Sequence, residues 1–431
     1  MDLMKVTTGL RPVHNMTPTL SEMTRVFARI GLLSFGGPAA QIALMHRELV
    51  ETRDWVTEKD YLSALSFCML LPGPEAMQLA TWTGWRMHGT KGGLIAGLLF
   101  VLPGAAVVLG LSMIYAAYGA VPLVAALFTG VQAAVVAIVI EALLRVSKRA
   151  LKGRVHWIIA GLAFFALFAL NIPFPVIILA AALFGALTST TVASPAPALP
   201  HAPAKTLTTL TIWLALWLIP LAVLWQFEQG LLFEIGLFFS KLAVVTFGGA
   251  YAVLAWMTQA VVQDKGWLTL PQMMDGLGLA ETTPGPLILV TEFVGYLAAH
   301  KQGGWDYGIA GAIVTLWMTF VPCFLWIFTF APYIARITAA PRLAGALKAI
   351  TAAVVGVIAN LSLWFAAHVI FRTVGKIDAG PLQLISPDWA SVDPLALAIG
   401  LVAAWLLLVR HWSLPIVLGL SALAAVATTL I

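Results

Sequence analysis

Phe35-Gly36-Gly37-Pro38 and Pro72-Gly73-Pro74 interrupt the apolar first part of the chain with helix-breaking residues. The same interruptions return later as Phe247-Gly248-Gly249 and Pro284-Gly285-Pro286, and 247 − 35 and 284 − 72 both equal 212. A helix break inside apolar sequence leaves backbone groups unpaired. Lipid does not tolerate such groups unless protein or a water-filled cavity surrounds them. Two different breaks that recur in fixed register therefore predict a duplicated transport site.

The composition places these breaks in a membrane protein. The chain has 431 residues, of which 61% are hydrophobic and 10% charged, and its mean hydropathy is +0.94. Ordinary globular chains carry roughly 25% charged residues. Apolar runs near the bilayer-spanning length of about 20 residues recur throughout the chain. They lie at 94–117, 121–144, 156–170, 210–225 and 396–409. We therefore expect an all-α polytopic protein embedded in a lipid bilayer.

Several classes of function are excluded by what the sequence lacks. The net charge of +5 comes from loop residues without a basic stripe interleaved with aromatics, which argues against nucleic-acid binding. The histidines show no metal-ligand spacing. No Ser/His/Asp set, nucleotide-binding loop or haem pattern is present, so we expect no enzymatic activity, no cofactor and no direct coupling to ATP. Cys68 and Cys323 do not occupy equivalent repeat positions, and we expect two separate buried thiols.

The repeat divides the chain into two homologous halves. We assign 1–20 to a basic cytoplasmic tail, 21–188 to the first transporter repeat, 189–206 to a linker rich in Pro, Ala, Ser and Thr, and 207–431 to the second repeat. Late in each half the offset grows from 212 to 219, as in the pair Pro103 and Pro322. This difference predicts a seven-residue insertion near 303–319.

The loop charges indicate that the two halves insert in opposite orientations. The loop at 145–154 is strongly basic and is cytoplasmic by the positive-inside rule. Its counterpart at 372–393 is nearly neutral, whereas Arg336 and Arg342 fall in the loop equivalent to the uncharged residues 118–120. Inverted repeats are typical of secondary transporters, whose substrate sites lie where the repeats meet near mid-membrane. We expect a cytoplasmic N-terminus.

The arms on either side of the first PGP sequence are too short to cross a bilayer. Residues 61–71 and 75–87 would form helices of roughly 16–20 Å at 1.5 Å per residue, against a hydrocarbon core of about 30 Å. The segment is either a re-entrant helical hairpin with the PGP at its tip or a spanning helix broken near the midplane. We favour the hairpin.

The breaks could bind an anion through their backbone. The N-terminus of a half-helix carries about half a positive charge and free N–H groups. Pro38 and Pro74 fit the first turn of the following half-helix, and glycine lets the backbone approach a ligand. A single break of this kind is more simply a kink for helix packing. For a duplicated pair in fixed register we favour the site.

Two cations accompany the breaks. Arg29 and Lys241 are separated by 212 residues, and each precedes by five residues a hydroxyl side chain, Ser34 or Thr246. A cation and a hydroxyl near a break suit an oxyanion, because intramembrane cations usually face a polar interior. The alternative is that both cations reach to the membrane interface.

Two carboxylates flank the PGP breaks. Glu75 follows the first break and Glu281 precedes the second, so the two do not match by repeat. A buried carboxylate could carry a coupling proton, and Glu75 is our first choice. Capping of the helix that begins at Pro74 explains Glu75 almost as well.

Phe35-Gly36-Gly37-Pro38, a following Trp55 and Pro72-Gly73-Pro74 resemble the signature of the chromate ion transporter family. The chain as a whole is similar to the long, two-domain members, although Ala250 replaces the proline of the first motif in the second half. The substrate-binding residues that we predict are Arg29, Ser34, Phe35, Gly36, Gly37, Pro38, Pro72, Gly73, Pro74, Lys241, Thr246, Gly248, Gly249, Pro284, Gly285 and Pro286. Glu75 and Glu281 are the predicted coupling residues.

The resemblance implies export of chromate from the bacterial cytoplasm across the inner membrane, and hence chromate resistance. Sulfate, a tetrahedral dianion of similar size, is the natural competitor, and protons are candidate coupling ions. We expect alternating access at a mid-membrane site. An uptake carrier for sulfate or another oxyanion and an anion channel remain alternatives. A homodimer is compatible with the sequence but not required, because the fused second half already supplies the other repeat.

Overall fold

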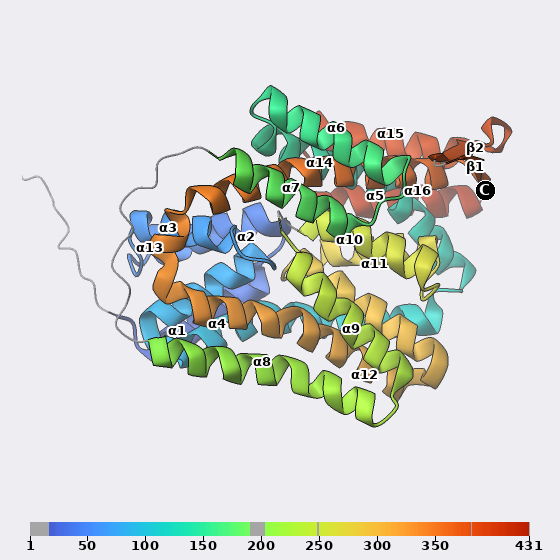
Figure 1. The fold of residues 1–431 in the computed structure, drawn as a ribbon. Helices are drawn as coiled ribbons and strands as arrows, with labels where there is room; N and C mark the ends of the chain where they lie inside the picture. Colours follow the sequence, from blue (N-terminus) through green and yellow to red (C-terminus); the bar gives the residue numbers. More distant parts are fainter. Residues whose placement is uncertain (1–16, 190–202, 248–249, 381, 431) are drawn as a thin grey trace, which may run out of the picture.

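The computed structural model describes residues 17–189, 203–247, 250–380 and 382–430, and the chain is almost entirely α-helical there (Figure 1). Most of the predicted tail lies outside these residues. Within the described part, α4, α5, α8, α14 and the stretch Leu287–Thr338 that contains α12 are long and apolar enough to cross a membrane. The predicted all-α polytopic fold is confirmed.

The elements of the first half are α1 (Leu20–Leu33), α2 (Gly37–His46), η1 (Arg47–Glu51), α3 (Glu58–Cys68), α4 (Glu75–Tyr118), α5 (Pro122–Ala150), α6 (Arg154–Phe168) and α7 (Phe174–Thr188). The elements that follow are α8 (Pro203–Gln226), α9 (Gly230–Val245), α10 (Ala250–Gln259), η2 (Ala260–Asp264), α11 (Leu270–Thr282), η3 (Leu287–Leu289), α12 (Val290–Phe330), η4 (Ala331–Tyr333), α13 (Ile334–Thr338), α14 (Pro341–Ile370), β1 (Val374–Ala379), β2 (Leu382–Pro387), η5 (Trp389–Ser391), α15 (Pro394–Leu408) and α16 (Leu414–Leu430).

The first half begins with two short helical hairpins. In the first, α1 runs to Ser34 and α2 starts again at Gly37, after Gly36 has turned the chain with φ = 85°. In the second, α3 leads to the PGP break and the first part of α4 leads back. His88 at the end of this arm bonds the carbonyl of Pro18, just before α1. Both hairpins therefore begin and end at the same end of the molecule.

Helix α4 is two helices joined by a sharp turn. The backbone leaves helical geometry at His88 and Gly89, where φ is −133° and 59°. The segments on either side then run antiparallel in close contact: a Cβ on Gly84 would lie 2.3 Å from the carbonyl oxygen of Gly92. Residues 75–87 are thus the return arm of a hairpin, and the hairpin that we favoured for the PGP segment is the observed arrangement.

The second half repeats this plan. α9 and α10 form its first hairpin, and α11 with the beginning of α12 forms its second around the second PGP break. Helix α12 then turns sharply at Gly304, with φ = 71°, as α4 does at Gly89. The two turning glycines are 215 residues apart (304 − 89), between the offsets of 212 and 219. The predicted insertion is therefore shared between the two segments of α12 on either side of Gly304 and lengthens each by about one helical turn of 3.6 residues.

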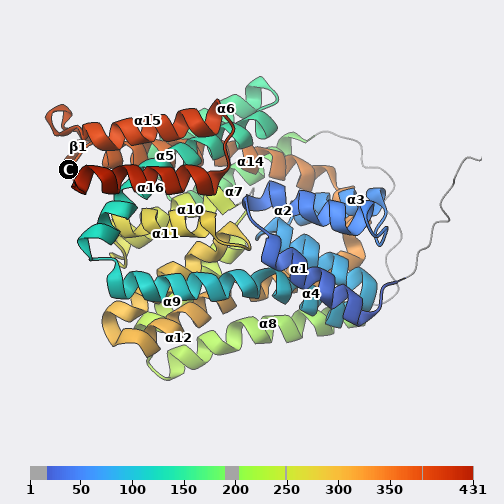
Figure 2. The same ribbon diagram turned by 180° about the vertical axis from the view of Figure 1, so that it is seen from behind.

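The hairpins of the two halves occupy opposite ends of the bundle. α1, α2 and α3 lie at one end, and α9, α10 and α11 lie toward the other (Figures 1 and 2). α8, which has no counterpart among the described residues before α1, carries the chain from the first end to the second (Figure 1). This additional crossing is compatible with the inverted repeat that the loop charges predict.

The two halves are interleaved rather than juxtaposed. α6 and α7 of the first half pack against α14 of the second, while α15 and α16 of the second half pack against α5 of the first. At the centre, α4 and α12 contact each other, and α1 and α9 cover their flanks. Cys68 and Cys323 are buried free thiols, as predicted.

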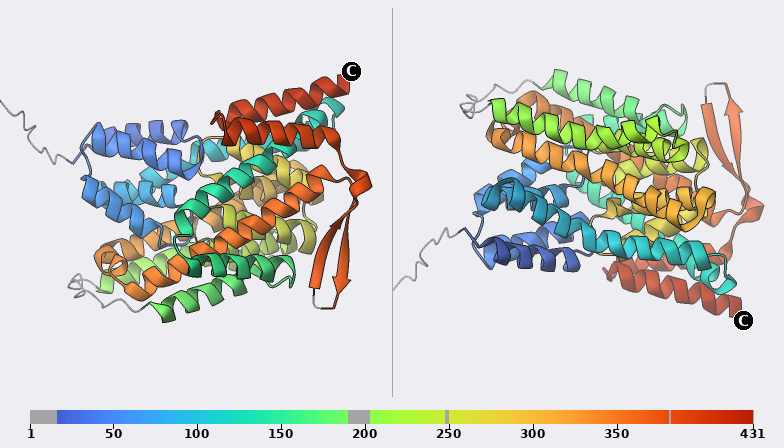
Figure 3. Two further views of the ribbon diagram at one scale, coloured as in Figure 1. Left: turned by 90° about the horizontal axis from the view of Figure 1, so that it is seen from above. Right: turned by 90° about the horizontal axis from the view of Figure 1, so that it is seen from below.

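A two-stranded sheet was not predicted from the sequence. β1 and β2 form an antiparallel hairpin, with Lys376 opposite Ile385, in the loop between α14 and α15. This β-hairpin lies across one end of the bundle (Figure 3).

Candidate functional site

The four helix breaks meet pairwise across the two halves. The N–H of Gly73 donates a hydrogen bond of 2.8 Å to the carbonyl oxygen of Thr246. The N–H of Gly285 donates one of 2.8 Å to the carbonyl oxygen of Ser34. These are the same bond in the two repeats, because 285 − 73 and 246 − 34 both equal 212. Each PGP tip is thus closed by the carbonyl that the FGG break of the other half leaves free.

Each PGP tip also packs against the long helix of the other half. A Cβ on Gly73 would lie 2.8 Å from Sγ of Cys323 in α12, and a Cβ on Gly285 would lie 3.5 Å from Cα of Gly104 in α4. Gly104 and Cys323 are equivalent at the offset of 219. Both tip glycines have positive φ, 122° and 90°. Glycine is required here by conformation and by space, and both tips lie beside the middle of a long helix.

Two buried glutamines, which the sequence analysis missed, hold the breaks together. Nε2 of Gln41 donates to the carbonyl oxygens of Gly285 (2.6 Å) and Ser34 (3.3 Å), and Nε2 of Gln78 donates to that of Pro72 (2.7 Å). Their side-chain oxygens have no hydrogen-bond partner among the described residues. Their spacing was a usable signal, since each follows a break by four residues: Gln41 after Gly37 and Gln78 after Pro74.

The two predicted hydroxyl side chains are buried at the ends of their own helices. Ser34 Oγ donates to the carbonyl oxygen of Ile30, and Thr246 Oγ1 to that of Leu242, both at 2.6 Å. Their protons are therefore engaged, and it is their backbone carbonyls that join the break. The predicted residues Gly248 and Gly249 lie outside the described residues.

The predicted cations are not drawn into the breaks. Arg29 and Lys241 are exposed, on the outward faces of α1 and α9, and within the described part of the chain neither has an ion-pair partner. Phe35, in the first FGG break, is also exposed, by 43%. The repeat therefore places the two cations equivalently but outside the buried part of the site.

The two predicted carboxylates differ in their surroundings. Glu281 is buried and accepts a hydrogen bond from the hydroxyl of Tyr251, which lies in the first turn of α10. Both residues line a small cavity together with Leu277. Glu75 is half-buried at the start of α4, where no side chain caps the helix N-terminus. The structure thus gives Glu281 a polar partner from the helix that follows the second FGG break.

Two further buried acids lie on the arms of the second PGP hairpin. Asp275 accepts hydrogen bonds from the hydroxyl of Tyr115 (2.7 Å) and from Nε2 of Gln132 (2.8 Å), so it joins α11 to α4 and α5 of the other half. Oε2 of Glu292 is buried without a partner among the described residues. Carboxylates inside apolar helices were visible in the sequence, but their cross-repeat partners were not.

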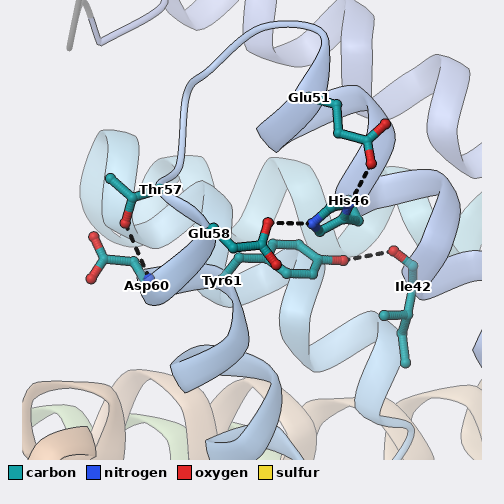
Figure 4. A network of polar contacts seen from close by, with 7 residues as sticks. All are labelled: Ile42, His46, Glu51, Thr57, Glu58, Asp60 and Tyr61. Atoms are coloured by element: carbon teal, nitrogen blue, oxygen red, sulfur yellow. Dashed lines mark hydrogen bonds and ion pairs between the residues drawn. The ribbon is translucent and has the colours of Figure 1, made fainter. Parts of the chain in front are cut away.

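A polar clamp formed by His46, Glu51 and Glu58 ties the two hairpins of the first half together (Figure 4). Nδ1 of His46 lies 3.0 Å from Glu51 Oε1, and its Nε2 lies 2.6 Å from Glu58 Oε2. Tyr61 adds a hydrogen bond to the carbonyl oxygen of Ile42. The bond to Glu58 is the main reason why the pKa of His46 lies above its usual 6.5. Among the described residues, no group of three or more His, Cys, Asp and Glu could hold a metal ion.

Comparisons with known proteins agree in pointing to one family. The profile of the family described as "Chromate transporter" matches residues 21–186 and 233–427. The chain is 31% identical over 358 residues to the "Probable chromate transport protein" of Synechococcus elongatus, covering 83% of this chain and 87% of that protein. It is 30% identical over 392 residues to the "Chromate transport protein" of Cupriavidus metallidurans, covering 88% and 90%. A protein of the same description in Pseudomonas aeruginosa is 34% identical over 344 residues, or 77% of each chain. No solved structure matches the chain.

Proposed function

The chain belongs to the chromate transporter family, and we propose that it carries chromate across the bacterial inner membrane, out of the cytoplasm, by alternating access. The observation that supports this most strongly is the reciprocal pair of hydrogen bonds from Gly73 to Thr246 and from Gly285 to Ser34. A site that is built half from each repeat changes when the repeats move relative to each other. Inverted repeats of this kind commonly move as units around a fixed site near mid-membrane.

The two FGG breaks differ in exposure, as we expect if the structure is one state of such a cycle. In the first half, Phe35 is 43% exposed, and Gly36 is exposed as well. In the second half, Phe247 is half-buried, and Ala250 is buried where the first half has the half-buried Pro38. We infer that the first FGG break is open and the second closed in this state, and that a state with the reverse arrangement completes the cycle.

The substrate that fits this site is a small divalent oxyanion. The helices α2, α4 and α10 all begin at the breaks, and their N-termini favour negative charge. The amide groups of Gln41 and Gln78 adjoin the same backbone. Arg29 and Lys241 would attract the anion from outside the buried region. Among the carboxylates, we assign the coupling proton to Glu281, because it is buried and hydrogen-bonded to Tyr251 at the second break.

Uptake of labelled chromate into inverted membrane vesicles tests this function. Vesicles that contain the protein should accumulate chromate when a pH gradient is imposed, and excess sulfate should compete only in part. Cells that express the protein should also tolerate more chromate than cells without it. Flux that ignores the gradient and is fully blocked by sulfate would instead identify an oxyanion channel or exchanger. Absence of chromate flux in well-expressed protein would refute the proposal.

A further inference from the structure

Two arginines, Arg145 and Arg149, lie one helical turn apart near the end of α5. Nη2 of Arg149 lies 2.8 Å from Sδ of Met69, three residues before the first PGP break. One turn earlier on α5, Arg145 is paired with Glu141. The α5 residues Val135, Ile138 and Val139 line the small cavity that contains Glu281, three residues before the second PGP break. Helix α5 thus runs past the residues that precede both PGP breaks, and Arg149 lies at the first of them.

Both guanidinium groups remain open to an approaching ligand. Arg145 is paired with Glu141 on the preceding turn of α5, yet its side chain is still 51% exposed. Arg149 is exposed; its described hydrogen bond is to a thioether, which carries no charge, and it also interacts electrostatically with Glu75. Two exposed guanidinium groups one helical turn apart match the size and charge of a tetrahedral dianion, which arginine binds through two parallel hydrogen bonds.

The arrangement is confined to one end of the molecule. At the offset of 219, the positions equivalent to Arg145 and Arg149 are Trp364 and His368 in α14. His368 is engaged with the carbonyl oxygen of Trp364, so α14 presents no comparable pair. A general requirement for basic residues that orient the helices does not explain why Arg149 contacts Met69, which leads into the first PGP break. Arg154, at the same end, has no such contact among the described residues.

We propose that Arg145 and Arg149 form the site that captures the oxyanion at the basic end of the bundle and delivers it to the breaks. This inference rests on the proposed function, because it takes the transported anion as the ligand. Glu141 competes with the anion for Arg145. When the anion binds, Arg145 leaves Glu141.

Substitutions of opposite expected effect test the site. Arg145→Gln and Arg149→Gln should each raise the KM for chromate about ten-fold or more, as expected for one charge-assisted hydrogen bond, and leave the maximal rate less affected. Glu141→Gln frees Arg145 and should lower the KM. Arg154→Gln removes a charge at the same end and should leave the KM unchanged. If Arg145 and Glu141 form only a structural pair, both substitutions should lower protein stability and neither should change KM in the stated direction.

Binding measured without transport separates this inference from the function on which it rests. Purified full-length protein should be stabilised against heat by chromate and by sulfate, and Arg145→Gln together with Arg149→Gln should abolish that stabilisation. Such binding in a protein that moves no chromate would refute the transport proposal and support the capture site. Chromate flux with an unchanged KM in both arginine variants would refute the capture site and leave the transport proposal standing.

Discussion

The two halves of this protein share one backbone and differ in the chemistry placed on it. Both have an FGG break closed by the PGP break of the other half, through bonds of equal length. In the first half the side chains that attach to the breaks are amides, Gln41 and Gln78. In the second half the equivalent positions are Val253 and Val290, and the polar side chains are instead Glu281 and Tyr251.

This difference separates the requirements of architecture from those of transport. The symmetric part is made of backbone and glycine, because the same junction forms twice. Each junction is the contact of one PGP break with the FGG break of the other half. The asymmetric part distinguishes the halves: the first half supplies neutral amides that bond the backbone of both PGP breaks, whereas the second half supplies a buried carboxyl group, Glu281. In the proposed function, this asymmetry would let one half bind the anion and the other respond to the coupling ion.

The largest effects should follow from changes to the shared backbone. A Cβ at positive φ costs roughly 1–2 kcal/mol, and at Gly73 it would also collide with Cys323. Gly73→Ala and Gly285→Ala should both reduce chromate flux about 100-fold, the scale expected when reacting or binding groups are misplaced. Gly110→Ala, where a Cβ meets nothing within 4 Å, should be silent. Flux and membrane abundance should be measured together. Normal chromate flux in Gly73→Ala or in Gly285→Ala would contradict the equivalence of the two junctions.

The next largest effects should distinguish the roles of the two carboxylates Glu281 and Glu75. Glu281→Gln should reduce gradient-driven accumulation by at least about ten-fold, the scale of losing one charged, hydrogen-bonded group. Tyr251→Phe keeps the carboxyl group and should have a smaller effect. Glu75→Gln should be milder still, because Glu75 is half-buried at a helix start. Accumulation as a function of the imposed pH gradient checks this order. Full gradient dependence in Glu281→Gln would return the coupling role to Glu75.

Smaller effects should come from the exposed cations. Arg29→Ala and Lys241→Ala should each lower flux severalfold and by similar factors, because the two residues are repeat equivalents that attract the anion without contacting the junction. Arg25→Ala, an exposed cation on the same helix as Arg29, serves as the control. Raised ionic strength should weaken the effect of both substitutions. Wild-type flux in both variants would show that Arg29 and Lys241 do not contribute to transport.

The smallest effect should appear in the clamp that is present only in the first half. Because the folded-state pKa of His46 is raised, the clamp stabilises the protein fully below pH 6.5 and loses this contribution as the pH rises through the higher, folded-state value. His46→Gln should therefore cost less than about 1 kcal/mol, and only at low pH. Thr258→Ala, at the equivalent position of the second half, should show no such pH dependence. Thermal unfolding at pH 6 and pH 9 compares the two variants.

The backbone plan was predictable from the sequence because glycine and proline mark helix breaks directly. The constant offset of 212 identified the duplicated junction, and the short arms around Pro72-Gly73-Pro74 favoured the observed hairpin. The reciprocal bonds between Gly73 and Thr246 and between Gly285 and Ser34 were beyond prediction, since an offset equates positions without saying which ones touch. The same holds for the packing of α6 and α7 around α14.

Side-chain roles were harder to predict than the backbone. The offset correctly made Arg29 and Lys241 equivalent, but it could not say that both would face outward, because the rotation of a helix depends on its packing partners. Gln41 and Gln78 were overlooked because neutral amides give a weaker signal in apolar sequence than charges do. The β-hairpin between α14 and α15 was overlooked as well, because its residues show no strong alternation of polar and apolar side chains.

The central claim is that the two halves complete a single site, and separating them tests it most directly. Residues 1–188 and 203–431 would be expressed alone and together, and labelled chromate accumulation would be measured in inverted vesicles with matched amounts of protein. We predict that neither half alone accumulates chromate and that the two together restore accumulation. Accumulation by either half alone at the rate of the pair would contradict a site shared between them.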